Sequence, residues 1–104
     1  MSGLDPSAIA QLESEWEPGR GFFWHLRQGE FRDDQLERTL ATLRLINAGD
    51  SDLLPRRWVS LLWYAPIFME WQRERVKESG VDSNRYEQAL SLILAEIERI
   101  LGFP

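Results

Sequence analysis

Apolar residues recur at helical spacing from the first segment of the chain onward. Ile9, Leu12 and Trp16 lie three and four residues apart, which places them on one side of a helix. Asp5 has the side chain of an N-cap and Pro6 suits the first turn, so we expect a helix from Pro6 to about Trp16. The intervening polar residues are expected to face water: Gln11, Glu13, Ser14 and Glu15.

A turn and a short apolar cluster follow this helix. Residues 17–21 contain a proline and two glycines, which favour a turn, and we interpret residues 18–21 as an ordinary turn and not as a phosphate-binding loop. The cluster Phe22–Leu26 is bounded by Gly21 and Gly29. It is too short for periodicity to classify, and we interpret it as a short helix.

The next apolar stripe indicates a helix capped by Asp33 or Asp34 that reaches Ala48. Gly49 is expected to close this helix as the residue just beyond its C-terminus. One side of the helix carries Leu36, Leu40, Leu43 and either Ile46 or Asn47.

A long helical segment begins near Pro55 and ends at Gly80. Pro66 lies inside it, and an internal proline loses one backbone hydrogen bond and clashes with the preceding turn, at a cost of roughly 3 kcal/mol. We therefore expect a kink or break near Tyr64 and Ala65, so that two helices can replace one.

The aromatic residues of this segment do not all fall on one side. One broad face carries Trp58, Leu61, Leu62, Ala65, Phe68, Met69 and Val76. The nearly opposite face carries Val59, Trp63, Ile67 and Trp71. We favour a helix buried at the centre of a bundle; the alternative is that Trp63 and Trp71 line an exposed patch or groove.

The last helix is expected from about Ser83 to Leu101, with Gly102 ending it. Its seam alternates spacings of four and three through Tyr86, Leu90, Ile93, Ile97 and Ile100, and packs against a neighbouring helix or another subunit. No segment shows sustained apolar–polar alternation, so the prediction is all-α: one domain over residues 1–104, a compact bundle of four to five helices.

Composition excludes several classes of function. The 104 residues contain no cysteine, which rules out disulfides, zinc–thiolate and iron–sulfur sites and thiol catalysis, and we expect a cytoplasmic protein. The longest apolar run, Trp58–Met69, is too short for a membrane span. The net charge of −5 disfavours binding to nucleic acid or anionic lipid.

The positive charges are almost all arginine, since Lys77 is the single lysine. Guanidinium groups suit bidentate pairing with carboxylates, so we expect intramolecular ion pairs. In particular, Glu70, Glu74 and Glu78 are interpreted with Arg73 and Arg75 as a solvent face linked by ion pairs, and not as a metal site.

His25 is the only histidine, with Glu30, Asp33 and Asp34 near it in sequence. A small hydrolytic enzyme centred on His25 is therefore one alternative function. Since no nucleophile motif accompanies it, we interpret His25 as a packed structural residue, and we expect no catalytic or metal residue and no cofactor.

The function that this profile favours is a small acidic, non-enzymatic module that binds and masks a partner protein. One form is a bacterial immunity protein that neutralises a toxin with a basic domain; the main alternative is a structural protein that forms a homodimer through the seam from Tyr86 to Ile100. The candidate contacts are Arg56, Arg57, Trp63, Trp71 and Arg75, with Glu30, Asp33 and Asp34. The acidic surface is expected to include Glu13, Glu15, Glu17, Glu30, Asp33, Asp34, Asp50 and Asp52.

Overall fold

Five helices form where the sequence combines an apolar stripe with turn residues at its ends. The computed structural model describes residues 6–49 and 52–103. The helices are α1 (Pro6–Ser14), α2 (Phe22–Arg27), α3 (Asp33–Leu45), α4 (Arg56–Glu78) and α5 (Ser83–Leu101). The described residues contain no strand, so the predicted all-α bundle of four to five helices is confirmed. The predicted N-cap, Asp5, lies outside the described residues.

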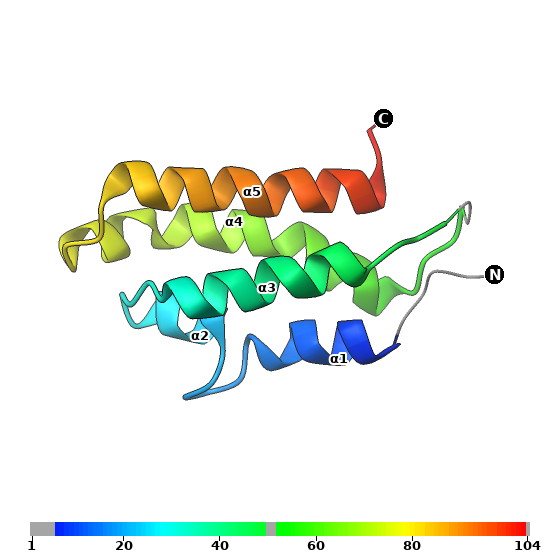
Figure 1. Cartoon of the computed structure of the whole chain (residues 1–104), viewed down its shortest axis with the longest axis horizontal. Helices are drawn as coiled ribbons and strands as arrows, with labels where there is room; N and C mark the ends of the chain where they lie inside the picture. Colours follow the sequence, from blue (N-terminus) through cyan, green and yellow to red (C-terminus); the bar gives the residue numbers. More distant parts are fainter. Residues whose placement is uncertain (1–5, 50–51, 104) are drawn as a thin grey trace.

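Helix α5 lies beside both α3 and α4, with α1 and α2 on the side away from α5 (Figure 1). Helix α3 contacts α5, α1 and α2, and helix α4 contacts α5, α2 and α1. The bundle measures 45 × 29 × 20 Å. Among the described residues, no helix combines the length and the apolar character that crossing a bilayer requires.

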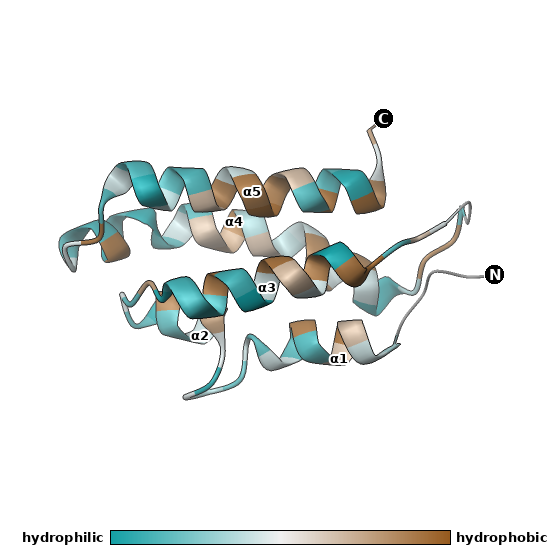
Figure 2. Ribbon diagram, in the orientation of Figure 1, coloured by the Kyte–Doolittle hydropathy of each residue, from teal (hydrophilic) through white to brown (hydrophobic). Residues whose placement is uncertain are grey.

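All five helices contribute apolar residues to one core. Every helix carries both apolar and polar segments in the hydropathy view (Figure 2). The side chains with essentially no exposed surface include Leu12, Phe22, Phe23, Leu26, Leu40, Leu43, Leu62, Met69, Tyr86 and Ile93. The short cluster at residues 22–26 is a helix, as predicted. The helix places the rings of Phe22 and Phe23 in the centre of the bundle.

The sequence predicts a kink or a break at Pro66, and α4 runs through Pro66 as one helix, so the break into two helices is wrong. The missing hydrogen bond is a local cost of about 3 kcal/mol. Apolar residues on both sides of the proline bury themselves on the same face, among them Leu62, Ala65 and Met69. Burial of a leucine or methionine side chain such as Leu62 or Met69 contributes about 1.5–3 kcal/mol, so packing offsets the local cost.

Helix α5 forms as predicted. Asp82 accepts a hydrogen bond from the Asn84 amide at 3.0 Å and caps its N-terminus, and Gly102 follows its C-terminus with φ of +85°. The sequence predicts that the seam of α5 packs against a neighbouring helix or another subunit. In the structure the seam is buried, and α3 and α4 are the helices that α5 contacts. The Tyr86 hydroxyl donates to the Met69 carbonyl at 2.6 Å and joins α5 to α4.

Helix α1 ends at Ser14, earlier than predicted, because the next residue, Glu15, accepts hydrogen bonds from the first amides of α2. The Glu15 carboxylate is completely buried, although the sequence pattern placed it in water. It accepts hydrogen bonds from the Phe22 amide at 3.0 Å and from the Arg38 guanidinium at 2.7 Å to each oxygen. Its backbone carbonyl also accepts from the Phe23 amide. Glu15 therefore connects α1, α2 and α3.

Helix α3 differs from its predicted limits at both ends. The N-cap position is held by Arg32, whose side chain makes no capping hydrogen bond, and Asp33 and Asp34 lie in the first turn. The helix ends at Leu45, so the predicted end at Ala48 with Gly49 closing it is wrong. Another helix bonds two carbonyls at this end: Arg99 of α5 donates to the carbonyl of Leu43 at 3.0 Å and to that of Ile46, the residue after the helix, at 3.1 Å.

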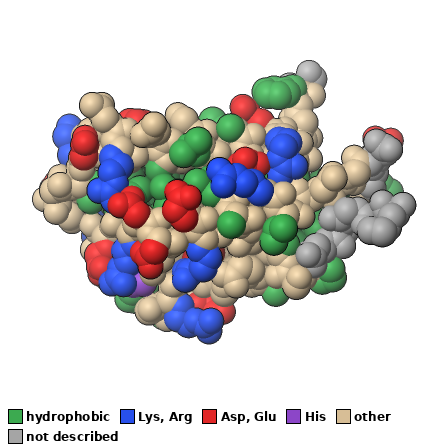
Figure 3. Space-filling view, in the orientation of Figure 1, with side chains coloured by type: hydrophobic (Ala, Val, Ile, Leu, Met, Phe, Trp, Pro, Cys, Tyr) green, Lys and Arg blue, Asp and Glu red, His purple; other side chains and the backbone are tan. Residues whose placement is uncertain are grey.

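The predicted ion pairs form, mostly between helices or across turns. Eight of the eleven arginines pair with a carboxylate of a described residue. Basic and acidic side chains accordingly lie next to one another over the face seen in Figure 3. The arginines for which the described residues supply no such partner are Arg27, Arg56 and Arg75.

Candidate protein-binding surface

The outer side of α4 carries a row of side chains four residues apart that no other helix covers. This outer row consists of Val59, Trp63, Ile67, Trp71 and Arg75. The exposed fraction is 48% for Trp63 and 65% for Trp71. The favoured interpretation of α4 as a fully central helix is therefore wrong, and the alternative of exposed tryptophans describes the structure. The residues predicted on the opposite face are all buried.

The exposed indoles of the outer row rest on a layer of packed rings. Trp63 and Trp71 both meet the ring of Tyr64 edge to face, each with ring centres 5.8 Å apart. Tyr64 in turn packs on Trp16 and Phe68. Such ring pairs prefer definite relative orientations, so the two indoles are presented on a rigid support.

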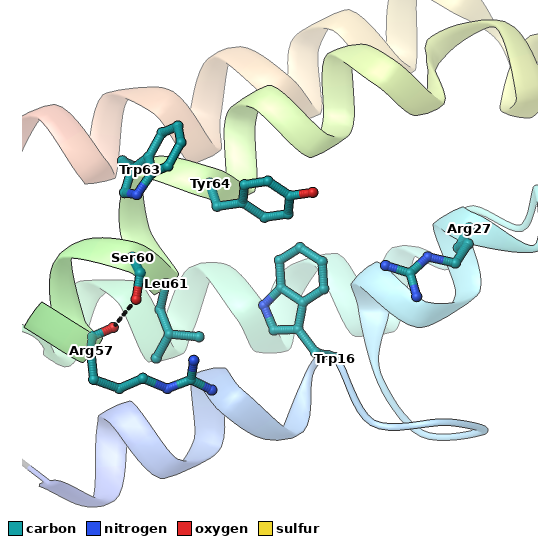
Figure 4. A pocket seen from close by; sticks show the side chains of 7 residues that line it. All are labelled: Trp16, Arg27, Arg57, Ser60, Leu61, Trp63 and Tyr64. Carbon is teal, nitrogen blue, oxygen red and sulfur yellow. Dashed lines mark hydrogen bonds between the residues drawn. The ribbon is translucent and has the colours of Figure 1, made fainter.

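A groove opens beside the outer row where α4 faces α1 and α2. This Trp16 groove has a volume of about 280 Å³. Its lining residues are Trp16, Arg27, Arg57, Ser60, Leu61, Trp63 and Tyr64. Figure 4 shows the guanidinium groups of Arg27 and Arg57 pointing toward Trp16 from opposite sides.

Two lining residues of this groove, Arg57 and Trp63, are among the protein contacts predicted from the sequence, and Trp16 and Arg27 are not. Trp16 was assigned to the apolar stripe of the first helix, and it lies beyond the end of α1, stacked on Phe23 with ring centres 4.4 Å apart. Arg27 lies in α2 with its guanidinium 5.2 Å from the centre of the Phe68 ring. No local pattern marks either residue, because three separate segments form the groove.

The charges around Trp71 do not pair as predicted. Arg73 pairs with Glu87 of α5 instead of with a carboxylate of its own helix, and this partner lowers the pKa of Glu87. None of the three α4 carboxylates, Glu70, Glu74 and Glu78, forms an ion pair with a described residue. The predicted solvent face of linked charges is therefore wrong, and the second half of the outer row is flanked by unpaired carboxylates.

Of the candidate arginines, Arg57 is engaged and the other two are not. Arg57 pairs with Glu13 of α1 at 2.7 Å. Arg75 belongs to the outer row, and Arg56 is exposed at the start of α4. Neither Arg56 nor Arg75 pairs with a carboxylate of a described residue, so both cations remain available to an external partner.

The candidate carboxylates near α2 and α3 form a separate group and are largely occupied. Glu30 pairs with Arg32 at 2.7 Å, and hydrogen bonding by that guanidinium lowers the pKa of Glu30. Asp33 accepts a hydrogen bond from Arg85 of α5 at 3.0 Å. Asp34 is exposed in the first turn of α3. Of these residues, Asp33 is tied to α5 by its ion pair. The structure does not bring any of the three into the outer row.

The wider predicted acidic surface is also smaller than expected. Glu15 is buried, as described above, so its assignment to that surface is wrong. Glu13 and Glu17 are engaged with Arg57 and Arg20. Asp52 is exposed, and Asp50 lies outside the described residues.

His25 is packed in the interior of α2. Its exposed fraction is 4%, and its Nδ1 lies 2.8 Å from the Gly21 carbonyl oxygen. Since a carbonyl can only accept, Nδ1 carries a proton in this arrangement. The predicted structural packing of His25 is confirmed. Across residues 6–49 and 52–103, no group of three or more potential metal ligands is gathered.

Comparison with protein-family models, with curated proteins and with solved structures finds no significant match to this chain.

Proposed function

We propose that this chain is a non-enzymatic module that binds a partner protein through the outer row of α4 and masks the partner's surface. The observation that carries the proposal is the exposure of Trp63 and Trp71 on one helical row above a core that is complete without them. Tryptophan and arginine dominate the binding energy of protein interfaces, and a rigid exposed pair is a typical anchor.

The exposed indoles supply the energy of such docking. A tryptophan side chain buries on the order of 150–250 Å², so covering the exposed part of one indole is worth about 2–3 kcal/mol. The two indoles, together with Val59 and Ile67 of the same row, form an apolar strip whose contact with water is unfavourable.

The charges indicate a partner with a basic surface. The chain carries a net charge of −5, and unpaired Glu70, Glu74 and Glu78 flank Trp71. Carboxylates in this position steer a cationic partner and hold it in register. The finer form of the proposal is an immunity-type protein that neutralises a toxin with a basic domain; it rests on charge and size.

Capture from a native cell extract followed by binding kinetics tests the proposal. A partner identified in this way should bind the Trp71→Ala variant at least 30-fold more weakly, because an anchor of about 2 kcal/mol is lost. Leu92→Ala on α5 is the matched control, since Leu92 is also exposed, and it should bind like wild type. Equal binding of the two variants would reject the outer row as the docking surface.

Charge steering is tested separately with the same partner. Combined Glu70→Gln, Glu74→Gln and Glu78→Gln substitutions should lower the association rate and its dependence on salt, with little change in the dissociation rate. Glu98→Gln on α5 provides the control for loss of a distant carboxylate. An association rate that is unaffected by salt in the wild-type chain would exclude a basic partner guided by these residues.

A further inference from the structure

We propose that the Trp16 groove is a binding site for a small amphipathic carboxylate, in which an apolar ring is joined to one carboxylate group. The groove shares Trp63 with the docking surface proposed above, but it lies between α4 and the first two helices and does not include Trp71. Its occupancy does not depend on a protein partner.

The charge inside the groove is opposite to that of the whole chain. The chain has 17 acidic and 12 basic residues, yet the seven lining residues include two arginines and no carboxylate. Arg57 is already paired with Glu13 at 2.7 Å. Arg27 has no carboxylate partner among the described residues and points toward Trp16 (Figure 4). One guanidinium is therefore free to bind one carboxylate, in the bidentate geometry that this pair favours.

The walls of the groove select the apolar part of the ligand. The rings of Trp16, Trp63 and Tyr64, together with Leu61, offer flat apolar surfaces on several sides. Trp16 is held firmly, because it stacks on Phe23 and meets Phe68 edge to face at 4.8 Å. An aromatic ring is the group that such walls accommodate best.

The indole N–H of Trp16 adds a hydrogen-bond donor. It is buried and has no acceptor among the described residues. In Figure 4 the nitrogen lies on the side of the ring that faces Leu61 and Arg57. Buried indole N–H groups normally have a partner. The described residues therefore leave this donor unused at the wall of the groove.

The size of the groove limits the ligand to a compact molecule. Sites for drug-sized ligands and cofactors occupy about 300–1,000 Å³, and this groove, at about 280 Å³, lies just below that range. A single free guanidinium also suits a monoanion better than a nucleotide with several phosphates. An arylacetate has the matching size, charge and ring.

The test is a titration of the full chain with phenylacetate, followed through the five tryptophan indole N–H signals in a ¹⁵N-correlated NMR spectrum. The signals are assigned with single Trp→Phe variants. Phenylacetate should shift the Trp16 and Trp63 signals together, with a dissociation constant on the order of 1 mM or below. The signal of Trp58, which is buried on the core side of α4, should stay in place and is the internal reference.

Two further ligands separate charge from shape. The neutral 2-phenylacetamide should bind about tenfold more weakly than phenylacetate, because it cannot pair with Arg27. Inorganic phosphate should leave both signals unchanged in the same concentration range. Equal binding of the amide would overturn the role of the carboxylate, and equal binding of phosphate would show a simple anion site without a ring subsite.

Variants assign the interaction to the groove. Arg27→Gln should weaken phenylacetate binding about tenfold, and Arg75→Gln, which removes another unpaired exposed arginine outside the groove, should not. Trp71→Ala should leave phenylacetate binding intact while it weakens the protein partner, so the two proposals fail separately. Absence of any shift in the Trp16 and Trp63 signals at saturating phenylacetate would overturn the proposed site.

Discussion

The buried carboxylate of Glu15 contributes more to the stability of this bundle than an exposed ion pair does. Glu15 has no exposed surface, and its carboxylate accepts hydrogen bonds from the Phe22 amide and from both donor groups of the Arg38 fork. By contrast, Glu17 and Arg20 form an exposed pair at 3.4 Å. Exposed pairs contribute about 0–1 kcal/mol, whereas a buried carboxylate that loses its charge leaves several donors poorly satisfied.

Replacing Glu15 with glutamine should therefore lower the free energy of unfolding by about 2–3 kcal/mol, measured by urea denaturation at neutral pH. The estimate stays below the largest values for buried pairs because Arg38 is 45% exposed and keeps part of its hydration. Glu17→Gln is the matched control and should change the free energy by about 0.5 kcal/mol at most. Similar effects of the two substitutions would contradict the structural role of Glu15.

Tyr86 should make the protein lose stability in alkaline solution. Burial raises the pKa of its phenol above the ordinary value of about 10. The raised folded-state pKa means that Tyr86 contributes fully below about pH 10, the pKa of the unfolded chain, and that this contribution falls as the pH rises further.

A Tyr86→Phe variant measures this contribution. At pH 7 it should be about 1 kcal/mol less stable than wild type, because the hydrogen bond to the Met69 carbonyl is lost. Above about pH 10 the wild type should lose roughly 1.4 kcal/mol per pH unit that the variant does not lose, so the difference disappears near pH 11. Parallel stability curves from pH 7 to 11 would rule out a raised pKa for Tyr86.

At the scale of elements, the connection between α1 and α2 is closely packed at Gly21. A Cβ atom added to Gly21 would lie 1.9 Å from the Glu15 carbonyl oxygen, which already accepts the Phe23 amide. Gly19, in the same turn, has φ of +76° but nothing within 4 Å of an added Cβ. The two glycines are therefore required for different reasons. Gly21 allows a close approach of two backbone segments, and Gly19 adopts a left-handed conformation.

Gly21→Ala should consequently destabilise the protein by about 3 kcal/mol or more, because the backbone of Glu15 has to move and take the start of α2 with it. Gly19→Ala should cost about 1 kcal/mol, from backbone strain alone. Thermal unfolding followed by circular dichroism compares the two. A smaller loss for Gly21→Ala than for Gly19→Ala would refute the close packing of this turn.

Helix α4 shows how packing overrides a local signal. Pro66 predicts a break, and a sequence pattern has no means of weighing that cost against the burial of Leu62, Ala65 and Met69. Helix α3 shows the same limit at a terminus, since the helix ends at Leu45, well before Gly49, and Arg99 from α5 bonds the carbonyls of Leu43 and Ile46 there. The sequence predicts that both helices exist, but it predicts neither the continuity of α4 nor the C-terminal end of α3.

For the molecule as a whole, apolar residues divide between a closed core and the exposed outer row. Phe68 and Trp71 lie three residues apart on the same helix, yet their exposed fractions are 2% and 65%. The candidate arginines and tryptophans were largely identified from residue type and helical position. Trp16 and Arg27 were not, because the groove exists only once α1, α2 and α4 are in place.

This division predicts opposite effects of two truncations. Phe68→Ala should lower the free energy of unfolding by about 3–5 kcal/mol, since it leaves a cavity beneath Tyr64 and Trp16. Trp71→Ala should change it by about 0.5 kcal/mol, because the indole is mostly in water already. Chemical denaturation of both variants provides the measurement. A large loss for Trp71→Ala would place that residue in the core and remove the basis of the docking surface.

The sequence alone determined the all-α class, the five helical segments, the core face of each long helix and the absence of thiol chemistry, because these properties depend on residue type and on spacings of three and four positions. Only the tertiary structure decided that Glu15 is buried, that Arg73 pairs with α5, and that Trp63 and Trp71 remain exposed beside a groove. Those outcomes depend on which helix covers which face, and contacts between residues far apart in the chain leave no mark on local periodicity.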